Sequence, residues 1–449
     1  MAKRLWDKGE SLDSQVQKFT IGNDPITDLA IVPWDVAASA AHARMLHSID
    51  VLSKDELNEL LEGLVKLKTS FDKGEFQIPY ELEDCHTAIE NFLVEELGET
   101  GKKIHTGRSR NDQVLVATRL YLRDSICQLL SLSTSLANQF LLRAEETLDK
   151  PMPGHTHFQR AMPTSFGVWF HSFAETLLGS ANSGLKLLET INCNPLGAAS
   201  GFGVPIPLDR ALTAKLLGFN RVQRNPISVI NSRGQYELQC VNWCLETVSA
   251  IEKFAFDLVL FSSEEFGLTK LPMHFTTGSS IMPQKRNPDV AELMRARVST
   301  VRGAAAELEW VIAKLPSNYH RDHQLTKDPL IRAINTTAEL ISMADSVAKE
   351  IKICAENAEK SLSDELFATY EAYRLVAEGS SFREAYAEAA KSSEAGTLNT
   401  SLLRNELDKV LGYAKEEILA CKKDIKDTEK SLSESSKAFK EATDSVLTT

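Results

Sequence analysis

The chain has 449 residues, a net charge of -12, a hydrophobic content of 43% and an aromatic content of 7%. These values describe a globular protein with room for two or three domains and a sizeable buried core. The acidic balance argues against non-specific binding of nucleic acid, and no apolar run approaches the ~20 residues that span a bilayer. We therefore expect neither nucleic acid nor a membrane among its partners.

The beginning of the chain and its cysteines bear on the compartment. The segment MAKRLWDKGESLDSQ lacks the apolar core of a secretory signal peptide. The seven cysteines are scattered without a CxxC pair, and Cys240 and Cys244 lie one helical turn apart in an apolar stretch. Because disulfides are rare in the reducing cytosol, we interpret the cysteines as core thiols and predict a cytoplasmic protein.

Long stretches without glycine or proline dominate the middle of the chain, at residues 111–149, 235–266 and 330–378. Apolar residues recur within them at three- and four-residue spacing, as at Val241 and Leu245, which is the periodicity of a helix. At about 1.5 Å per residue, the first stretch would form a helix several tens of Å long. We expect a neighbouring subunit to bury the apolar stripe of such a helix.

Strand signals are few, and the best of them, RVQRNPISVI, is interrupted by Pro226. We therefore predict an all-α fold, with a central bundle of long helices and smaller helical domains at both ends. The predicted domains are residues 1–108, residues 109–362 and residues 363–449. The charged, weakly periodic end of the chain is predicted to be a surface helix with a frayed tail.

Polar segments interrupt the helical pattern, and the first is HTGRSRNDQ at residues 105–113. It sets Arg108 and Arg110 beside Asn111 in an acidic protein. Two arginines two residues apart favour a clamp for carboxylate or phosphate groups. The alternative is a basic cap on the following helix.

The second segment, GHTHFQRAMPTSFG, carries His155, Thr156 and His157 between two prolines. A His-x-His pair is compatible with metal binding, but no Asp, Glu or Cys stands at ligand spacing beside it. A structural capping role is a further alternative. We favour a general acid or base histidine, with the threonine orienting a substrate.

The third segment is GSSIMPQKRNP, residues 278–288. Asn287, followed by Pro288 and Asp289, predicts a helix start with Asn287 as its N-cap. The Gly-Ser-Ser entry offers backbone N–H groups, and Lys285 adds a positive charge, both suited to a developing oxyanion. An ordinary connecting loop is the alternative.

A fourth polar segment, NYHRDHQLTKD, also lies between helices and completes a larger pattern. GSSIMPQKRNP resembles the signature loop of the fumarase/aspartase superfamily. Within that superfamily TGRSRNDQ, HTHFQRAMP, Gln284 before the lysine, and YHRDHQLTKD together resemble the argininosuccinate lyase family. The resemblance is close over residues 82–345, looser over residues 5–50 and weak after residue 391.

This resemblance implies an all-α homotetramer with four active sites, each built from three subunits, and no metal or organic cofactor. It implies reversible cleavage of argininosuccinate, a small-molecule substrate, into arginine and fumarate, the last step of arginine biosynthesis. The catalytic residues implied, including the acid said to pair with the histidine, are Ser279, His157, Lys285 and Glu292. The resemblance also implies substrate-binding residues, and we add Arg110 to them for its residue type. The substrate-binding residues expected are Arg110, Asn111, Thr156, Asn287, Tyr319, Gln324 and Lys327. Which of Ser279 and His157 is the base stays open, and we favour Ser279.

The chain also departs from the pattern of the family. RLWDKGES and FTIGND replace its usual N-terminal motifs, so that Gly22 or Asn23 stands near the place of a substrate-contacting serine. Tyr386 stands where a histidine is common, and a glycine-rich finish is lacking. Two alternatives to cleavage of argininosuccinate remain: a non-catalytic structural protein on the same scaffold, as in the lens δ-crystallins, or another fumarate-releasing lyase.

Overall fold

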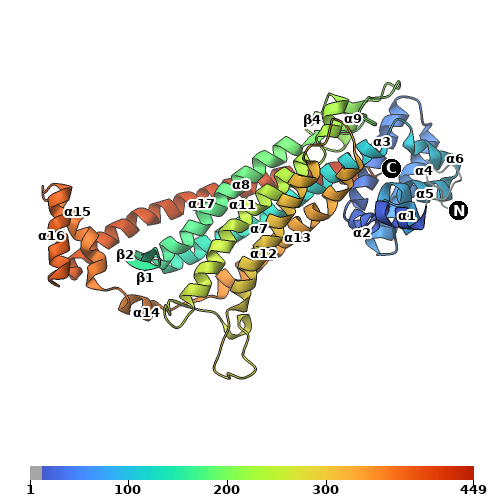
Figure 1. Cartoon of the computed structure of the whole chain (residues 1–449). Coiled ribbons are helices and arrows are strands. Elements are labelled where there is room, and N and C mark those ends of the chain that lie inside the picture. The colour runs from blue at the N-terminus through green and yellow to red at the C-terminus, as the bar shows by residue number, and fades with distance from the viewer. Residues whose placement is uncertain (1–12, 449) are drawn as a thin grey trace.

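The computed structural model describes residues 13–448, so the motif RLWDKGES lies outside the described residues. An N-terminal part made of short helices packs at one end of a long bundle (Figure 1). Its helices are α1 (Ser14–Ile21), α2 (Asp24–Thr27), α3 (Val32–Ser48), α4 (Lys54–Asp72), α5 (Cys85–Leu97) and α6 (Glu99–Lys102). Single 3-10 turns follow α2, precede α5 and follow α6, at Asp28–Ala30, Tyr80–Leu82 and Lys103–His105.

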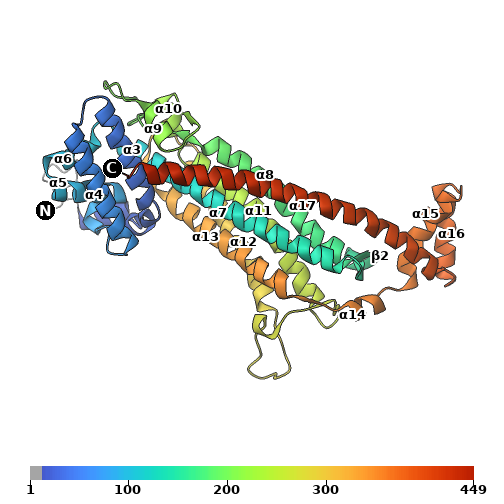
Figure 2. The same cartoon turned by 180° about the vertical axis from the view of Figure 1, so that it is seen from behind.

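Long helices form the centre of the molecule and run side by side (Figures 1 and 2). They are α7 (Arg110–Thr147), α8 (Phe166–Ile191), α11 (Gln235–Phe261), α12 (Asp289–Ile312) and α13 (Lys327–Glu350). α7 begins where the Ser109 side chain and Asp112 form a capping box. With 38 residues, α7 is roughly 55 Å long. The prediction of an all-α fold with unusually long helices is confirmed.

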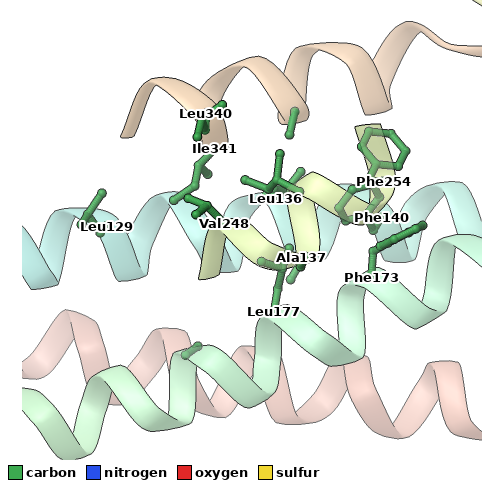
Figure 3. Packing of buried hydrophobic residues seen from close by; sticks show 14 of the residues in the cluster. Leu129, Leu136, Ala137, Phe140, Phe173, Leu177, Val248, Phe254, Leu340 and Ile341 are labelled. Carbon is green, nitrogen blue, oxygen red and sulfur yellow. The ribbon is translucent and has the colours of Figure 1, made fainter. Parts of the chain in front are cut away.

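The bundle is held together by a continuous apolar core (Figure 3). Phe140 of α7 lies edge-on to Phe254 of α11, with their ring centroids 4.9 Å apart. Phe173 of α8 completes this aromatic group, with its centroid 5.5 Å from that of Phe140. Aromatic pairs at these separations add to the free energy gained from burial, so they fix the three helices against one another.

Strands are few and short, as expected. β1 (Pro151–Thr156) and β2 (Gln159–Ser165) form an antiparallel hairpin, whereas the other strands form two-residue pairs. Those strands are β3 (Cys193–Asn194), β4 (Arg221–Val222), β5 (Thr269–Lys270) and β6 (Lys352–Ile353). The segment RVQRNPISVI was the best strand signal, and that interpretation is largely wrong: only its first two residues pair, and Asn225 caps α10 (Pro226–Asn231).

Two predicted helix boundaries need correction. The stretch 330–378 is not one helix, because the chain leaves α13 at Ile351 and pairs β6 with β5. α12 begins at Asp289 with Pro288 at its N-cap position, one residue later than predicted. Asn287 does not cap it, because its backbone pairs with that of Thr277. Pairing with a distant strand at β6, and pairing across the preceding loop at α12, override the local sequence signal.

The C-terminal part begins with α14 (Ala355–Lys360), a 3-10 turn (Asp364–Phe367), α15 (Ala368–Ala377) and α16 (Phe382–Glu394). α17 (Thr400–Ser445) then runs back along the whole bundle, which corrects the predicted surface helix with a frayed tail (Figure 2). Its residues Ile418, Cys421, Ile425 and Leu432 belong to the core of the bundle. This buried stripe explains why so polar a segment forms a continuous helix.

The end of α17 reaches the N-terminal part, where Arg44 Nε donates a hydrogen bond to the carbonyl of Val446 at 2.9 Å. The predicted division at residues 1–108, 109–362 and 363–449 stays a prediction, and α17 extends from the third of these ranges along the second. α9 (Arg210–Leu216) lies in the connection between α8 and α11.

The cysteines are all unpaired, and all but Cys354 are buried, as their interpretation as core thiols requires. Among residues 13–448, no helix combines the length and the apolar character needed to cross a membrane.

Candidate active site

A cavity of about 230 Å³ lies where the N-terminal part meets the first turn of α7 and the segment before α13. Five residues expected to bind a substrate line it together: Arg110, Asn111, Tyr319, Gln324 and Lys327. Its remaining walls come from Ile21, Asp24, Glu83, Asp84, Thr87, Val114, Arg233 and Arg321. The structure thus gathers side chains from segments that lie far apart in the sequence.

Lys327, the first residue of α13, is buried between two carboxylates. Its ammonium group forms an ion pair with Asp28, which is fully buried, and lies 3.0 Å from Asp24 Oδ1. Burial alone would lower the pKa of Lys327, but the charges of Asp28 and Asp24 raise it above its ordinary value. Lys327 therefore stays charged at any physiological pH, with acidic partners already in contact.

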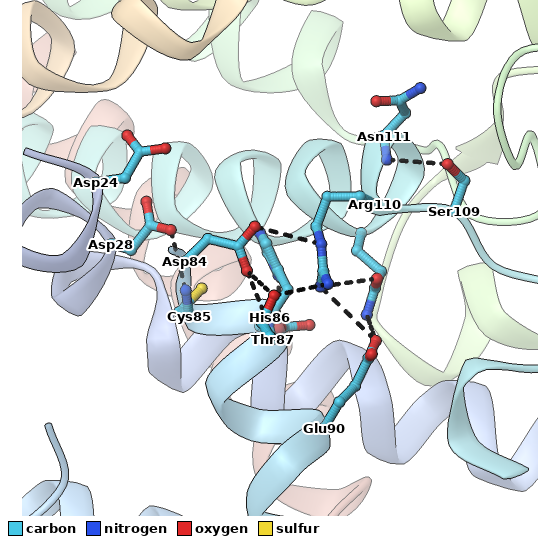
Figure 4. Close-up of polar contacts among 12 residues, drawn as sticks. Asp24, Asp28, Asp84, Cys85, His86, Thr87, Glu90, Ser109, Arg110 and Asn111 are labelled. Atoms are coloured by element: carbon cyan, nitrogen blue, oxygen red, sulfur yellow. Dashed lines mark hydrogen bonds and ion pairs between the residues drawn. The ribbon is translucent and has the colours of Figure 1, made fainter. Parts of the chain in front are cut away.

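The pKa of Asp24 is also raised, which in an aspartate favours the neutral form. Burial and, to a smaller degree, the neighbouring charges of Asp28 and Asp84 raise its pKa to about 6 against the attraction of Lys327. Figure 4 shows Asp24, Asp28 and Asp84 along one side of the site. Asp24 thus titrates close to neutrality, which is unusual for an aspartate.

Arg110 is fixed by side chains of α5 and by Asp84, the N-cap residue of α5 (Figure 4). Its Nη2 donates to Thr87 Oγ1 at 2.9 Å, and its Nε lies 3.3 Å from the carboxylate of Asp84, the N-cap of α5. Its Nη1 lies 3.7 Å from Glu90. Burial would raise the pKa of Glu90, but a hydrogen bond with His105 and the charge of Arg110 lower it to about 2.

Arg108 and Arg110 do not act as a pair of clamps. Arg108 is buried, and its Nη1 donates to Ser39 Oγ at 2.9 Å, so only Arg110 reaches the cavity. Asn111, the second residue of α7, also lines the cavity, and its backbone N–H is capped by Ser109 Oγ at 3.3 Å.

The segment before α13 is tied to the N-terminal part by hydrogen bonds. Gln324 Nε2 donates to the carbonyls of Thr20 at 2.8 Å and Ile21 at 3.0 Å. Gln324 lies in a 3-10 helix, Arg321–Thr326. Tyr319 packs under the guanidinium of Arg233, which lies 5.3 Å from the centre of its ring. From the divergent FTIGND segment, Ile21 and Asp24 line the cavity rather than Gly22 or Asn23.

Thr156 and His157 lie elsewhere, at the far end of the bundle. They belong to the β1–β2 hairpin, which follows the C-terminal end of α7, whereas Asn111 lies at its N-terminal end. The length of α7 therefore separates the two places by roughly 55 Å. His157 has φ of 54° at the tip of the hairpin and lines a second cavity of about 460 Å³ with Phe158 and Phe256.

The loop between α11 and α12 holds Ser279 and Lys285 and projects from the bundle (Figure 1). Ser279 Oγ accepts the backbone N–H groups of Ile281 at 3.3 Å and Met282 at 3.2 Å. Lys285 is exposed in the same loop, and Glu292 lies 3.8 Å from Arg295 on α12. These residues, and Asn287, do not line the first cavity. One subunit thus brings five of the predicted residues together and leaves Thr156, His157, Ser279, Lys285, Asn287 and Glu292 apart from them.

Sequence reasoning missed the acidic residues of the cavity. Asp84 and Thr87 stand in EDCHT, directly before an apolar helical stretch, and this polar segment was a readable signal. Asp24 and Asp28 gave no such signal, because their partner Lys327 lies almost 300 residues away and only the fold joins them.

One cluster has side chains of the kinds that bind metals. Ligand atoms of Asp28, Cys85 and His86 lie within 4.8 Å of one another (Figure 4). Asp28, however, already pairs with Lys327, and His86 Nδ1 lies 2.7 Å from Asp35. Burial and the neighbouring carboxylates raise the pKa of Cys85, which keeps its thiol protonated and a poor ligand. We therefore assign no metal to this cluster, and it belongs to the support of Lys327.

Comparison with known proteins places the chain in a family. Residues 9–303 match the sequence family described as "Lyase". The chain is 41% identical to an argininosuccinate lyase of Xylella fastidiosa over 88% of both chains. It is 43% identical to those of Thermotoga neapolitana and Sorangium cellulosum, over 86% and 87% of this chain and 97% and 90% of theirs.

Solved structures share the fold. The crystal structure of EDDS lyase in complex with formate has a TM-score of 0.80 at 20% identity and covers 97% of this chain and 95% of its own. The class II fumarase from Schistosoma mansoni has a TM-score of 0.70 at 17% identity, over 85% and 91%. At such identities the likeness concerns the fold alone. The sequence relatives decide the matter: the chain belongs to the argininosuccinate lyase family.

Proposed function

We propose that this protein is an enzyme that cleaves argininosuccinate reversibly into arginine and fumarate, as the last step of arginine biosynthesis. The observation that carries the proposal is the meeting of Arg110, Asn111, Tyr319, Gln324 and Lys327 in one cavity of a chain from this family. The cavity is lined by arginine, lysine and carboxylate side chains, which suits a substrate with both carboxylate and cationic groups.

The reaction is a β-elimination. A base removes a weakly acidic proton from the carbon beside a carboxylate, and the intermediate places extra negative charge on the oxygens of that carboxylate. Lys285 and the backbone N–H groups of the Gly278–Ser280 region are suited to stabilise this charge, an effect of about 3–4 kcal/mol per preorganised donor. Asn287 would hold the same carboxylate.

Ser279 is the base in this proposal. Its Oγ accepts two backbone N–H groups, from Ile281 and Met282, and donors of this kind favour the alkoxide over the hydroxyl. His157, held by Glu292 in the assembled site, supplies the proton that the departing guanidine nitrogen needs. Thr156 orients the substrate beside it.

The distances within one chain support a proposed homotetramer with shared active sites. No single substrate spans the roughly 55 Å of α7, so Asn111 and His157 of the same subunit serve different sites. Large apolar side chains also stand exposed along the bundle, among them Trp310 at 73% and Leu293 at 59%. Partner subunits covering them would complete the four sites. We place this assembly in the cytoplasm, with small-molecule substrates and without a metal or organic cofactor.

The experiment that tests the proposal is direct. Purified protein is mixed with argininosuccinate, fumarate is followed by its ultraviolet absorbance, and arginine is identified by chromatography. Equal amounts of fumarate and arginine are expected. No fumarate from a correctly assembled protein would point to a structural role on the same scaffold. Fumarate released only from a different amine adduct would point to another lyase reaction.

A further inference from the structure

At the first cavity, two carboxylates share the one ammonium group of Lys327. Asp28 is fully buried, forms the ion pair with Lys327 and also accepts the backbone N–H of Cys85 at 3.1 Å. It is therefore the permanent counter-ion of Lys327. Asp24 approaches the same ammonium from the cavity side, at 3.0 Å, and lines the cavity itself.

The group formed by Lys327, Asp28 and Asp24 carries a net charge of -1 when both carboxylates are ionised. A partly buried carboxylate in excess is costly unless a cation accompanies it. Asp84 does not relieve this excess, because it is acidic itself and is paired with Arg110. Burial, with the charges of Asp28 and Asp84 added to it, raises the pKa of Asp24 to about 6. The site is thus arranged to accept a cationic group at Asp24.

We propose that Asp24 binds the α-ammonium group of the arginine half of the substrate, an inference that rests on the proposed function. Argininosuccinate carries two cationic groups, the guanidinium and the α-ammonium. The guanidinium is part of the bond that breaks and must lie against Ser279 and His157, which other subunits supply. The α-ammonium lies at the opposite end of the arginine half, and it is the cation left to meet Asp24.

This contact makes Asp24 a specificity-determining residue. The ammonium would replace part of the interaction between Asp24 and Lys327 and free the lysine to approach the adjacent α-carboxylate. Discrimination then arises because a ligand without the ammonium leaves the Asp24 carboxylate buried and unpaired.

The test uses direct binding to the intact protein. The probes are L-arginine and its deamino analogue, in which hydrogen replaces the ammonium group, both titrated by calorimetry. The wild type is expected to prefer arginine by about 10- to 100-fold, the range for a charge-assisted hydrogen bond. Asp24→Asn keeps the shape and removes the charge, so it should abolish this preference while leaving the affinity for the analogue within about twofold. Asp24→Glu should restore part of the preference.

A matched control removes a carboxylate away from the cavity. Glu99 is 86% exposed on α6, and Glu99→Gln should leave both affinities unchanged. In the steady state, Asp24→Asn should raise KM for argininosuccinate with little change in kcat, the sign of binding lost equally in ground and transition states. Circular dichroism and the thermal unfolding midpoint show whether each variant is folded.

The dependence on pH gives a second readout. The charged groups that act on Asp24 are Lys327, Asp28 and Asp84. The other charged residues lining the same cavity are Glu83, Arg110, Arg233 and Arg321. Because Asp24 is neutral below its pKa of about 6, the preference for arginine should fall as the pH decreases through 6. In Asp24→Asn no such fall should remain.

Several outcomes would overturn the inference: a wild type that binds both ligands equally, an Asp24→Asn variant that loses affinity for both to the same degree, or one that keeps the preference. Failure of the proposed function is recognised separately. If the wild type prefers arginine through Asp24 but releases no fumarate from argininosuccinate, the function is wrong and the ammonium site stands. If fumarate is released without any such preference, the reverse holds.

Discussion

The ammonium group of Lys327 lies 3.0 Å from the carboxylate of Asp24 and also pairs with Asp28, so one buried lysine joins α13 to the N-terminal part. Lys327→Met would leave Asp28 buried without its counter-ion. We expect a loss of about 3–5 kcal/mol in the free energy of unfolding, seen as a lower thermal midpoint. Lys103→Met is the control, because that lysine forms a partly exposed ion pair with Glu56 and its loss should cost about 1 kcal/mol or less. Equal effects of both variants would contradict this role of Asp28.

Glu90 predicts how stability changes in acid. Its pKa in the folded protein is about 2, below the ordinary value of 4.5, despite a burial that would raise it. A depressed pKa contributes stability that is complete above pH 4.5 and lost as the pH falls from 4.5 to 2. Glu90→Gln should therefore lower the free energy of unfolding by roughly 3 kcal/mol at pH 7, and by much less near pH 2. Denaturant titrations at several pH values would measure the free energy of unfolding of the variant and the wild type. A loss that does not depend on pH would contradict the lowered pKa of Glu90.

α17 offers a matched pair of residues for testing whether it belongs to the core. Ile418 is buried in the bundle, whereas the next residue, Leu419, is 53% exposed. Ile418→Ala should cost about 2–5 kcal/mol because it leaves a cavity. Leu419→Ala on the same helix should cost about 0.5 kcal/mol or less. Thermal unfolding compares the two, and equal costs would mean that α17 is only loosely attached to the bundle.

The fold was largely predictable because helical periodicity is a local signal. The stretches that became α7 and α11 could be read from the spacing of their apolar residues. The break after Glu350 could not, because it depends on backbone pairing with a distant strand, and the start of α12 could not, because it depends on backbone pairing across the preceding loop. The burial of one face of α17 could not be predicted for a similar reason. The apolar stripe of α17 is thin, and only contact with α7 and α8 gives the helix a buried face.

The candidate site divides in the same way. Arg110, Asn111, Tyr319, Gln324 and Lys327 were named from local motifs, and the structure places them in one cavity. The partners that set their charges were not predictable, because Asp24 and Asp28 become neighbours of Lys327 only in the folded chain. A sequence motif gives the residue types, whereas the charge state depends on burial and on contacts between distant segments.

Ser279→Ala separates binding from chemistry. The hydroxyl acts mainly in the transition state, so the variant should lose turnover while its affinity for argininosuccinate stays within about tenfold of the wild type. Ser280→Ala, the neighbouring serine in the same loop, is the matched control and should keep most of the activity. Kinetics and calorimetry give the two quantities. Affinity lost together with activity would make Ser279 a binding residue instead.

Complementation between inactive variants is a direct test of the shared active site. Asn111→Ala and His157→Ala are co-expressed with different tags, hybrid tetramers are purified through both tags, and light scattering confirms their mass. Because the two residues of one chain lie at opposite ends of α7, random mixing should create sites with both residues intact. On the order of one quarter of the wild-type sites should then be restored.

The control pair is Asn111→Ala with Lys327→Ala. These residues line the same cavity of one chain, so every hybrid site keeps one damaged residue and activity should stay absent. We expect fumarate release from the first hybrid and none from the second. Hybrid tetramers of Asn111→Ala and His157→Ala that remain as inactive as their parents would contradict the shared active site.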